Sequence, residues 1–466
     1  MNRASMEKTP LESWIARKIG VDGNGLTRRH IQDYQAHKLQ QVLERARHAS
    51  PFYRVLLRRF DSAPVTTLDD FARVPFTTAE DIRQQGLQFL CVSQSEISRV
   101  KTLESSGTTG PVKRMHFTPD DQELTVDFFH HGMSTLVEAG DRVLILLPGE
   151  RDGSVGDLLG KALIRLGAEP VPHGVVRSLS GTIEVMEQTG VNSLVGIPIQ
   201  ALALARYADT VQGKQLRLKS ALLSTDYVPQ AVVRELRKLW SCDVFEHYGM
   251  SEMGLGGGVD CKAHAGYHLR EGDLYFEIID PETGEILPEG ERGEIVVTTL
   301  TRRGMPLIRY RTGDFSRLLP DPCPCGTLLR RMAPVAARQG NRVILRGGKS
   351  FTLGDLDEAV FAVDRVVDYR AAVDSRSSTA MLELGVTVIG RTDAAMKKVL
   401  YQAVGTIDSI ANEQRNGALN VSLSVFATPD PEAPQPMKRT IQELGKTYAI
   451  QNTLSHQARK NMAAQR

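Results

Sequence analysis

The chain contains little cysteine and no long apolar run. Its 466 residues include only five cysteines. So few cysteines, in an odd number, argue against a disulfide scaffold. No apolar segment reaches the roughly 20 residues that a membrane-spanning helix needs, so we expect no transmembrane segment. The first ten residues are polar and lack an apolar signal segment, and we therefore expect a cytoplasmic protein.

An excess of charge of one sign is also absent. The chain has 57 basic and 55 acidic side chains and a formal net charge of +2. A nucleic-acid-binding protein usually carries a basic excess gathered on one face, so this balance argues against nucleic acid as a partner. The hydrophobic content of 41% is enough for a substantial core, and the length predicts two or more structural units.

From about residue 140 the sequence alternates between short apolar runs and amphipathic segments. Strands are predicted at 142–148, 169–173, 193–198, 221–225 and 243–248, with helices at 156–167, 182–190 and 230–240. Such alternation indicates right-handed crossovers and a largely parallel sheet. Earlier in the chain, a helix is predicted at 28–48. The phrase Phe-Thr-Thr-Ala-Glu-Asp-Ile-Arg (76–83) has a capping-box pattern, with a threonine as the cap and an acid three residues later, and therefore predicts that a short helix follows.

The pattern changes after residue 265. Segments 267–280 and 293–300 read as strands joined by a turn-rich stretch that starts at Pro281, which is typical of an antiparallel subdomain. Hydrophobic periodicity is lost near 333–343 and a mixed segment follows. The predicted fold is therefore α/β, with a large N-terminal domain (1–336) of mostly parallel sheets plus the antiparallel subdomain. A small, mobile α+β C-terminal domain (337–466) follows, with a hinge near 338–342.

One loop concentrates small hydroxyls and flexible backbone. It contains Ser105, Ser106, Gly107, Thr108, Thr109, Gly110 and, shortly after, Lys113. Backbone amides freed by glycine can form an anion-binding nest, and a lysine adds a point charge for phosphate. The loop lacks the Gly-Lys-Ser/Thr order of a Walker-type phosphate loop. Two interpretations remain open from the residues alone, a phosphate cradle and an ordinary solvated loop.

Two further phrases place polar side chains at strand ends. Tyr248, Gly249, Ser251 and Glu252 follow a predicted strand, at the edge where parallel sheets collect ligands. Asp314 ends the phrase Arg-Tyr-Arg-Thr-Gly-Asp at a tight turn, where a carboxylate can accept both hydroxyls of a ribose. Taken singly, each has an ordinary alternative as a core aromatic, a solvated acid or a turn former.

Together and in this order, these phrases resemble the adenylate-forming superfamily of acyl-CoA synthetases and ligases, and its phenylacetate-CoA ligase branch in particular. The resemblance covers roughly residues 40 to 350. It also rests on Ser-Pro-Phe-Tyr (50–53), Phe-Thr-Thr-Ala-Glu-Asp-Ile-Arg (76–83), Asp-Pro-Glu-Thr-Gly-Glu (280–285), Thr-Thr-Leu (298–300), Gly-Met-Pro-Leu-Ile-Arg (304–309) and Cys-Pro-Cys-Gly (323–326).

The resemblance implies an enzyme that uses ATP, Mg²⁺ and coenzyme A on a small-molecule carboxylate, with an aromatic acid favoured. The carboxylate attacks the α-phosphate of ATP to give an acyl-adenylate and pyrophosphate, and the thiol of coenzyme A then takes the acyl group. Two alternatives stay open: transfer of the acyl group to an amine or a carrier protein, and a degenerate nucleotide-binding member without ligase activity.

The resemblance also implies roles for individual residues. The 105–110 loop and Lys113 would hold the β- and γ-phosphates, Glu252 would bind Mg²⁺, and Ser251 would reach the α-phosphate. Tyr248 with Gly249 would lie near the adenine, Asp314 would hold the ribose, and Asp226, beside Ser224, would line the adenine and acyl pocket. Arg346 and Gly347 match a turn that borders the pantetheine channel in relatives.

The C-terminal region departs from the family pattern. The hinge phrase has Gln339, Gly340 and Asn341 where relatives have an arginine and aspartates. Relatives also bring a lysine of the C-terminal domain to the adenylation site. Lys438 and Lys446 are the candidates here, with two solvated surface lysines as the alternative.

The last candidate site is a structural zinc centre, built from Cys261, His268, Cys323 and Cys325. Zinc prefers four thiolate and imidazole ligands in a closed tetrahedron. His264, at Cys-x-x-His spacing from Cys261, competes with His268, which we prefer because its Gly-Tyr-His phrase resembles one in the related branch. The alternative is a set of buried free thiols. A homodimer is compatible with such a chain, although the sequence contains no interface signal.

Overall fold

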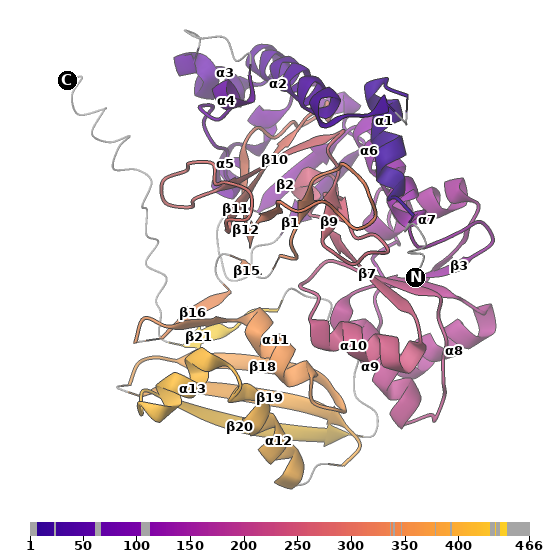
Figure 1. Cartoon of the computed structure of the whole chain (residues 1–466), viewed down its shortest axis with the longest axis vertical. Helices are drawn as coiled ribbons and strands as arrows, with labels where there is room; N and C mark the ends of the chain where they lie inside the picture. Colours follow the sequence, from indigo (N-terminus) through magenta and orange to yellow (C-terminus); the bar gives the residue numbers. More distant parts are fainter. Residues whose placement is uncertain are drawn as a thin grey trace.

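The structure is a computed structural model of the whole chain (Figure 1). It describes residues 7–22, 25–60, 67–103, 112–335, 337–338, 341–345, 347–377, 379–391, 394–428, 434 and 439–444. Among these residues, no helix is both long and apolar enough to cross a membrane.

The N-terminal segment is helical. It contains α1 (Pro10–Ile19), α2 (Arg28–Ala49), α3 (Pro51–Leu56), η2 (Leu57–Phe60), α4 (Leu68–Phe71), α5 (Ala79–Gln85), η3 (Gly86–Phe89) and η4 (Gln94–Glu96). The predicted helix at 28–48 is confirmed: it begins after Thr27, whose side chain accepts from the amide of His30, and ends before Pro51. The capping box predicted in 76–83 is also present, and the structure identifies its members as Thr78 and Asp81 at the start of α5.

A nine-stranded sheet forms the centre of the molecule, in the order β13-β14-β9-β8-β7-β6-β5-β3-β4. Its parallel half consists of β3 (Arg142–Ile145), β4 (Glu169–Pro172), β5 (Ser193–Gly196), β6 (Ser220–Leu223) and β7 (Asp243–Tyr248). The helices of this half are α6 (Pro119–Met133), α7 (Val155–Leu166), α8 (Leu179–Thr189), α9 (Pro198–Thr210) and α10 (Gln230–Trp240). The predicted parallel alternation is therefore confirmed.

The remaining strands of this sheet are antiparallel: β8 (Gly258–Val259), β9 (Tyr267–Leu269), β13 (Leu318–Leu319) and β14 (Arg331–Met332). A separate antiparallel sheet contains β10 (Leu274–Ile279), β11 (Gly293–Thr299), β12 (Tyr310–Ser316) and β15 (Ala337–Arg338). A hairpin of β1 (Arg99–Leu103) and β2 (Lys113–Phe117) flanks the 104–111 loop, which lies outside the described residues.

The prediction of one continuous strand over 267–280 was wrong. The chain turns between β9 and β10, which belong to different sheets. Buried Arg270 and Asp273 form a 2.8 Å ion pair within this turn. Because Arg270 also donates to the carbonyl of Leu124 in α6, the turn is fixed by a tertiary contact that the local sequence does not reveal.

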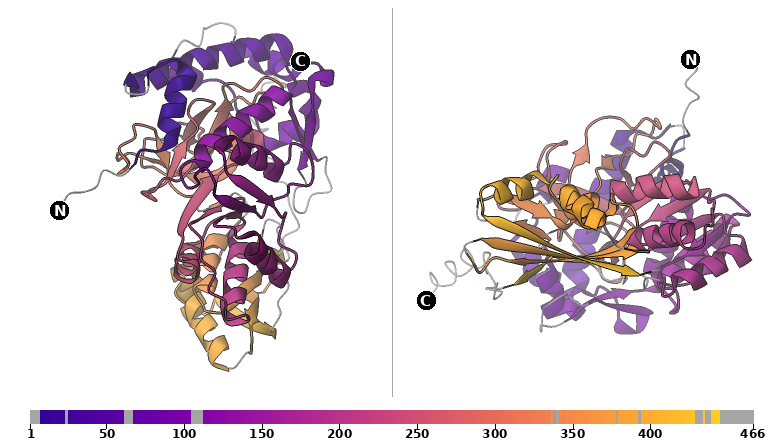
Figure 2. Two further views of the ribbon diagram at one scale, coloured as in Figure 1. Left: turned by 90° about the vertical axis from the view of Figure 1, so that its right-hand side faces the viewer. Right: turned by 90° about the horizontal axis from the view of Figure 1, so that it is seen from below.

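The C-terminal region is α+β, as expected. It begins with the hairpin of β16 (Arg342–Ile344) and β17 (Ser350–Thr352) and continues with the sheet β20-β19-β18-β21. Its strands are β18 (Val366–Asp374), β19 (Ala380–Ile389), β20 (Leu419–Thr428) and β21 (Gln442–Leu444), and its helices are α11 (Leu353–Phe361), α12 (Ala394–Val404) and α13 (Asp408–Arg415). The left view of Figure 2 shows this region at the lower end of the molecule, beside the helices of the parallel half.

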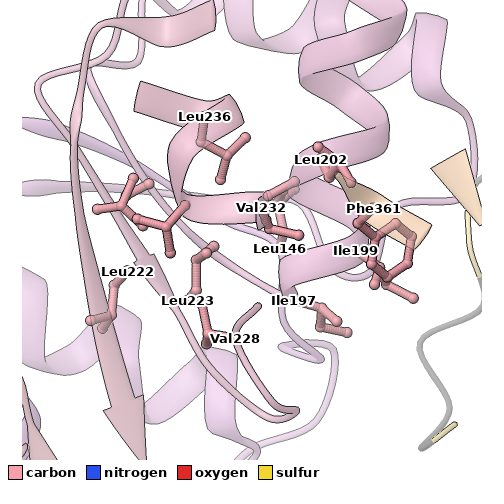
Figure 3. Packing of buried hydrophobic residues seen from close by; sticks show 14 of the residues in the cluster. Leu146, Ile197, Ile199, Leu202, Leu222, Leu223, Val228, Val232, Leu236 and Phe361 are labelled. Carbon is pink, nitrogen blue, oxygen red and sulfur yellow. The ribbon is translucent and has the colours of Figure 1, made fainter. Parts of the chain in front are cut away.

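Buried apolar side chains connect the C-terminal region to the parallel half of the sheet. Figure 3 shows Phe361 of α11 next to Ile199 and Leu202 of α9, in the cluster that includes Leu223 of β6 and Val232 of α10. Burial of apolar surface contributes about 25 cal/mol per Å². The C-terminal region is therefore packed onto α9 and α10 and is not merely tethered to them.

Candidate active site

The predicted site residues gather at the carboxyl ends of two adjacent parallel strands. Ser224 and Asp226 follow β6, whereas Tyr248 ends β7 and leads into the short helix η5 (Ser251–Met253), which holds Ser251 and Glu252. Side chains collect here because parallel strands end at a common edge of the sheet, open to ligands.

Gly249 is required by the close approach of backbone at this edge. A Cβ atom added to residue 249 would lie 2.0 Å from the carbonyl oxygen of Leu255, a distance that no side chain tolerates. Glycine therefore lets the chain turn from β7 into η5, and this turn brings Glu252 under the sheet edge.

Glu252 and Lys113 meet although 139 residues separate them. The Lys113 ammonium contacts the Glu252 carboxylate and lies 3.2 Å from the Tyr310 hydroxyl, which is 3.3 Å from the same carboxylate. Glu252 is 3% exposed, so its charge is balanced inside the protein. Burial raises the pKa of Tyr310 well above its ordinary value, and the nearby Glu252 charge adds to this rise, so its hydroxyl stays protonated.

Asp314 lies on β12 beside the same edge, where two side chains contact its carboxylate. The Tyr248 hydroxyl donates to one carboxylate oxygen at 3.1 Å, and the Arg338 guanidinium lies 3.3 Å from the other. Burial raises the pKa of Tyr248, and the Asp314 charge raises it further. The tyrosine therefore remains a hydrogen-bond donor, and the two side chains orient the Asp314 carboxylate.

Some predicted residues cannot be placed. Ser105 to Gly110, Arg346 and Lys438, together with Lys446, Gln339 and Gly340, lie outside the described residues. Gly347 is described and lies against the C-terminal helix α13, because a Cβ at this position would be 2.3 Å from a Glu413 carboxylate oxygen.

The structure adds residues to which the sequence pattern assigned no role. Tyr310 links Lys113 and Glu252, and its only sequence signal was its place in the phrase that ends at Asp314. Arg302, which is 4% exposed, donates to the carbonyl oxygens of Glu252 (2.8 Å) and His116 (3.0 Å). It thereby joins η5 to β2, the strand that begins with Lys113. Its sequence neighbours Thr301 and Arg303 are themselves polar, so no signal in the sequence singled it out.

The four predicted zinc ligands form one cluster. Donor atoms of Cys261, His268, Cys323 and Cys325 all lie within 4.8 Å of one another, and all four residues are buried. The Sγ atoms of Cys261 and Cys323 are 3.7 Å apart, as are Cys325 Sγ and His268 Nε2. Three thiols and one imidazole form a donor set that suits Zn²⁺ in a closed tetrahedral site.

The competing histidine is not part of this cluster. His264 Nδ1 instead lies 2.9 Å from the Asp260 carboxylate. The geometry therefore favours His268 over His264 as a member of the cluster, because His268 lies on β9 with its Nε2 beside Cys325 Sγ, whereas His264 pairs with Asp260.

Comparisons with known proteins agree with this geometry. Residues 105–301 match the family described as AMP-binding enzyme. A phenylacetate-coenzyme A ligase of Aromatoleum evansii is 30% identical over 334 residues, which is 68% of this chain and 73% of that protein. One from Thermus thermophilus is 29% identical over 365 residues, covering 76% of this chain and 80% of the relative.

A solved structure shares the fold. A 2-hydroxyisobutyryl-CoA ligase in its postadenylation state superposes with a TM-score of 0.72 over 89% of each chain, at 21% identity. The sequence match to the ligases covers 68–76% of this chain, and the shared fold covers 89% of it. This protein belongs to the AMP-binding enzyme family, in its phenylacetate-coenzyme A ligase-like branch.

Proposed function

We propose that this protein is an AMP-forming acid-CoA ligase that acts on an aromatic acid. ATP and the carboxylate give an acyl-adenylate and pyrophosphate, and coenzyme A then takes the acyl group, releasing AMP. The observation that carries this proposal is the meeting of Lys113 with Glu252 at the carboxyl edge of the sheet, within the matched family region.

The chain's own residues mainly position reactants and balance charge. Lys113, with the 105–110 loop, holds the β- and γ-phosphates, so its positive charge stabilises the pyrophosphate as it leaves. Ser251 holds the α-phosphate. Tyr248 and Gly249 border the adenine, and the oriented Asp314 carboxylate accepts the ribose hydroxyls.

Glu252 fits a Mg²⁺ ligand, because proteins usually hold this ion through one or two carboxylates together with the phosphates of the substrate. When bound, Mg²⁺ neutralises phosphate charge. Tyr310 and Arg302 keep Glu252 in place, through its carboxylate and its carbonyl oxygen respectively.

The remaining assignments concern the acyl group and the C-terminal region. Asp226 lines the adenine and acyl pocket, and Arg346 with Gly347 borders the path of the thiol. Lys438 is the lysine for adenylation. Phenylacetate or a related aromatic acid is the proposed substrate, since the relatives carry that name.

The zinc ion is proposed as structural. Its four ligands come from the β8–β9 segment and from the 323–326 loop, and all are buried, which leaves no open position for a substrate. We also propose that residues 337–466 form a mobile domain, which is packed onto α9 and α10 in the conformation described here. A cytoplasmic location and the absence of a nucleic-acid or membrane partner are proposed as well. A homodimer is the proposed assembly, which analytical ultracentrifugation tests.

A pyrophosphate-release screen tests the reaction. The acids are phenylacetates, benzoates, aminobenzoates and fatty acids, each with and without coenzyme A. We expect pyrophosphate with an aromatic acid, and AMP release that depends on coenzyme A. No pyrophosphate with any acid would overturn the proposal.

Glu252→Ala tests the site itself. Acid-dependent ATP–pyrophosphate exchange should fall by about 100-fold or more, because the charge balance at the phosphates is lost. Glu291→Ala, an exposed acid in a turn, is the matched control and should exchange like the wild type. Exchange at the wild-type rate in Glu252→Ala would remove this residue from the mechanism.

A further inference from the structure

The connection between β6 and α10, residues 224–229, contains a strained position. Thr225 has a φ of 76°. A β-branched residue in this left-handed region is a conformational outlier, which persists only where surrounding contacts hold it. Thr225 lies between Ser224 and Asp226, at the edge of the sheet where the candidate active site is built.

One of these contacts comes from Glu358 of α11. Its Oε1 accepts from the Tyr227 hydroxyl at 2.9 Å and from the Gln230 amide at 2.6 Å, and its Oε2 accepts from the Ala231 amide at 3.0 Å. Helix α10 lacks a side-chain cap of its own, because Pro229 occupies the N-cap. Glu358 therefore caps α10 from the C-terminal region and fixes the end of the connection.

The second contact comes from Arg439. Its guanidinium binds both oxygens of Asp357 at 2.7 Å, and its Nε lies 3.7 Å from the Asp226 carboxylate. The Asp357 side chain is 1% exposed, and Arg439 also lies over the rings of Phe361 and Tyr369. Arg439 is thus immobilised in the C-terminal region and presents its charge to Asp226.

Ser224 completes the support from the other side. Its hydroxyl lies 2.8 Å from His247 Nδ1, on the neighbouring strand β7. The connection is therefore held on one side by the sheet and on the other by two side chains of the C-terminal region. Within the proposed reaction, on which this inference rests, the connection borders the adenine and acyl pocket.

We propose that Glu358 and Arg439 are positioning residues, which hold the 224–229 connection in the shape that lines the adenylate site. Through these two residues the C-terminal region contributes to substrate binding, although neither the Glu358 nor the Arg439 side chain touches the substrate. Loss of either contact lets Thr225 relax toward an ordinary conformation, and Asp226 then leaves its place at the pocket.

Glu358→Ala tests this inference in the full-length enzyme. The KM of the acid, measured by ATP–pyrophosphate exchange, should rise about ten- to hundredfold, with a smaller change in kcat. Glu358→Gln retains one acceptor oxygen and should give a smaller rise. Asp374→Asn is the matched control, since Asp374 pairs with Arg376 on the surface of the C-terminal region. A merely structural role would lower the active fraction and leave the KM unchanged.

The Thr225→Gly variant tests whether the effect of Glu358→Ala depends on the strained backbone conformation of Thr225. Glycine adopts a φ of 76° without steric cost, so the connection needs less support. The rise in KM caused by Glu358→Ala should therefore be at least about threefold smaller in the Thr225→Gly background. An unchanged KM in Glu358→Ala, or an equal rise in both backgrounds, would overturn the inference.

The dissociation constant of ATP, measured by calorimetry on the same proteins, keeps this test separate from that of the proposed function. If the wild type shows no exchange with any acid, the proposed reaction fails. The positioning role is then decided by ATP binding, where about tenfold weaker binding by Glu358→Ala supports it and equal binding overturns it.

Discussion

His247, the residue before Tyr248, is enclosed by aromatic side chains. Its ring centroid lies 6.2 Å from that of Phe128 and 6.1 Å from that of Phe129. Burial lowers the pKa of His247 to about 4, because it disfavours the charged imidazolium, and the nearby Arg270 cation adds to this. The folded protein therefore holds this histidine in its neutral form.

This histidine should make the fold sensitive to acid. Its pKa is lower in the folded than in the unfolded chain, where it is near 6.5. The contribution of this pKa difference to the free energy of unfolding is fully present above pH 6.5 and is lost as the pH falls toward 4. When the pH falls from about 7.5 to 4.5, the free energy of unfolding of the wild type should decrease by about 2 kcal/mol more than that of His247→Phe. Urea denaturation measures this.

His37→Phe is the control for this measurement, because His37 is exposed on α2. Its stability should fall with pH as in the wild type. Equal pH dependence in His247→Phe and the wild type would show that protonation of His247 does not contribute to acid unfolding.

At the scale of elements, the cysteine and histidine cluster joins two loops that are distant in sequence. Cys261 and His268 flank the turn between β8 and β9, whereas Cys323 and Cys325 lie between β13 and β14. These strands are short, with two or three residues each, so few backbone hydrogen bonds hold them. A metal ion with four protein ligands would supply the missing stability.

Removal of one ligand should therefore release the metal and destabilise the fold. In Cys325→Ser, elemental analysis should find less than stoichiometric zinc, and the Tm should fall by about 5 °C or more. A strong chelator should lower the Tm of the wild type in the same way.

His264→Ala is the matched control, because this histidine lies beside the cluster but pairs with Asp260. It should keep stoichiometric zinc. Zinc content that is unchanged in Cys325→Ser, or absent from metal-replete wild type, would contradict the proposed centre.

At the scale of the molecule, a buried arginine joins the C-terminal region to the parallel half of the sheet. Arg206 of α9 is 3% exposed and donates to the carbonyls of Phe361 (3.0 Å), Val363 (2.9 Å) and Val366 (2.5 Å). Phe361 is the last residue of α11, Val363 lies in the connection that follows, and Val366 begins β18. The last carbonyl groups of a helix have no hydrogen-bond partner within the helix, and Arg206 binds that of Phe361 at the end of α11.

Arg206→Met should weaken this junction. We expect the free energy of unfolding to fall by about 3 kcal/mol, because buried carbonyls lose charged hydrogen-bond partners. Trp240 of α10, which is 1% exposed, offers a local fluorescence signal for urea denaturation. Arg142→Met, which removes an exposed ion pair with Glu169, is the control and should cost less than about 1 kcal/mol. Equal stabilities of the two variants would contradict the role of Arg206.

The sequence by itself determined the features that depend on local physics or on spacing. The alternation of apolar runs predicted the parallel strands, and the phrase at 76–83 predicted a capped helix, because both patterns act within a few residues. The cysteine and histidine spacing predicted the cluster, because a structural zinc ion is usually bound by four thiolate or imidazole ligands. The ordered phrases indicated the family.

Only the tertiary structure decided which residues that are distant in the sequence contact one another. The break of the 267–280 segment into two sheets depends on the contact of Arg270 with α6, and the support of Thr225 depends on Glu358 and Arg439, which are far away in the sequence. Likewise, Tyr310 acquires a role only because Lys113 and Glu252 meet beside it. A linear pattern records which residue types are available, whereas packing across the whole chain selects the partners.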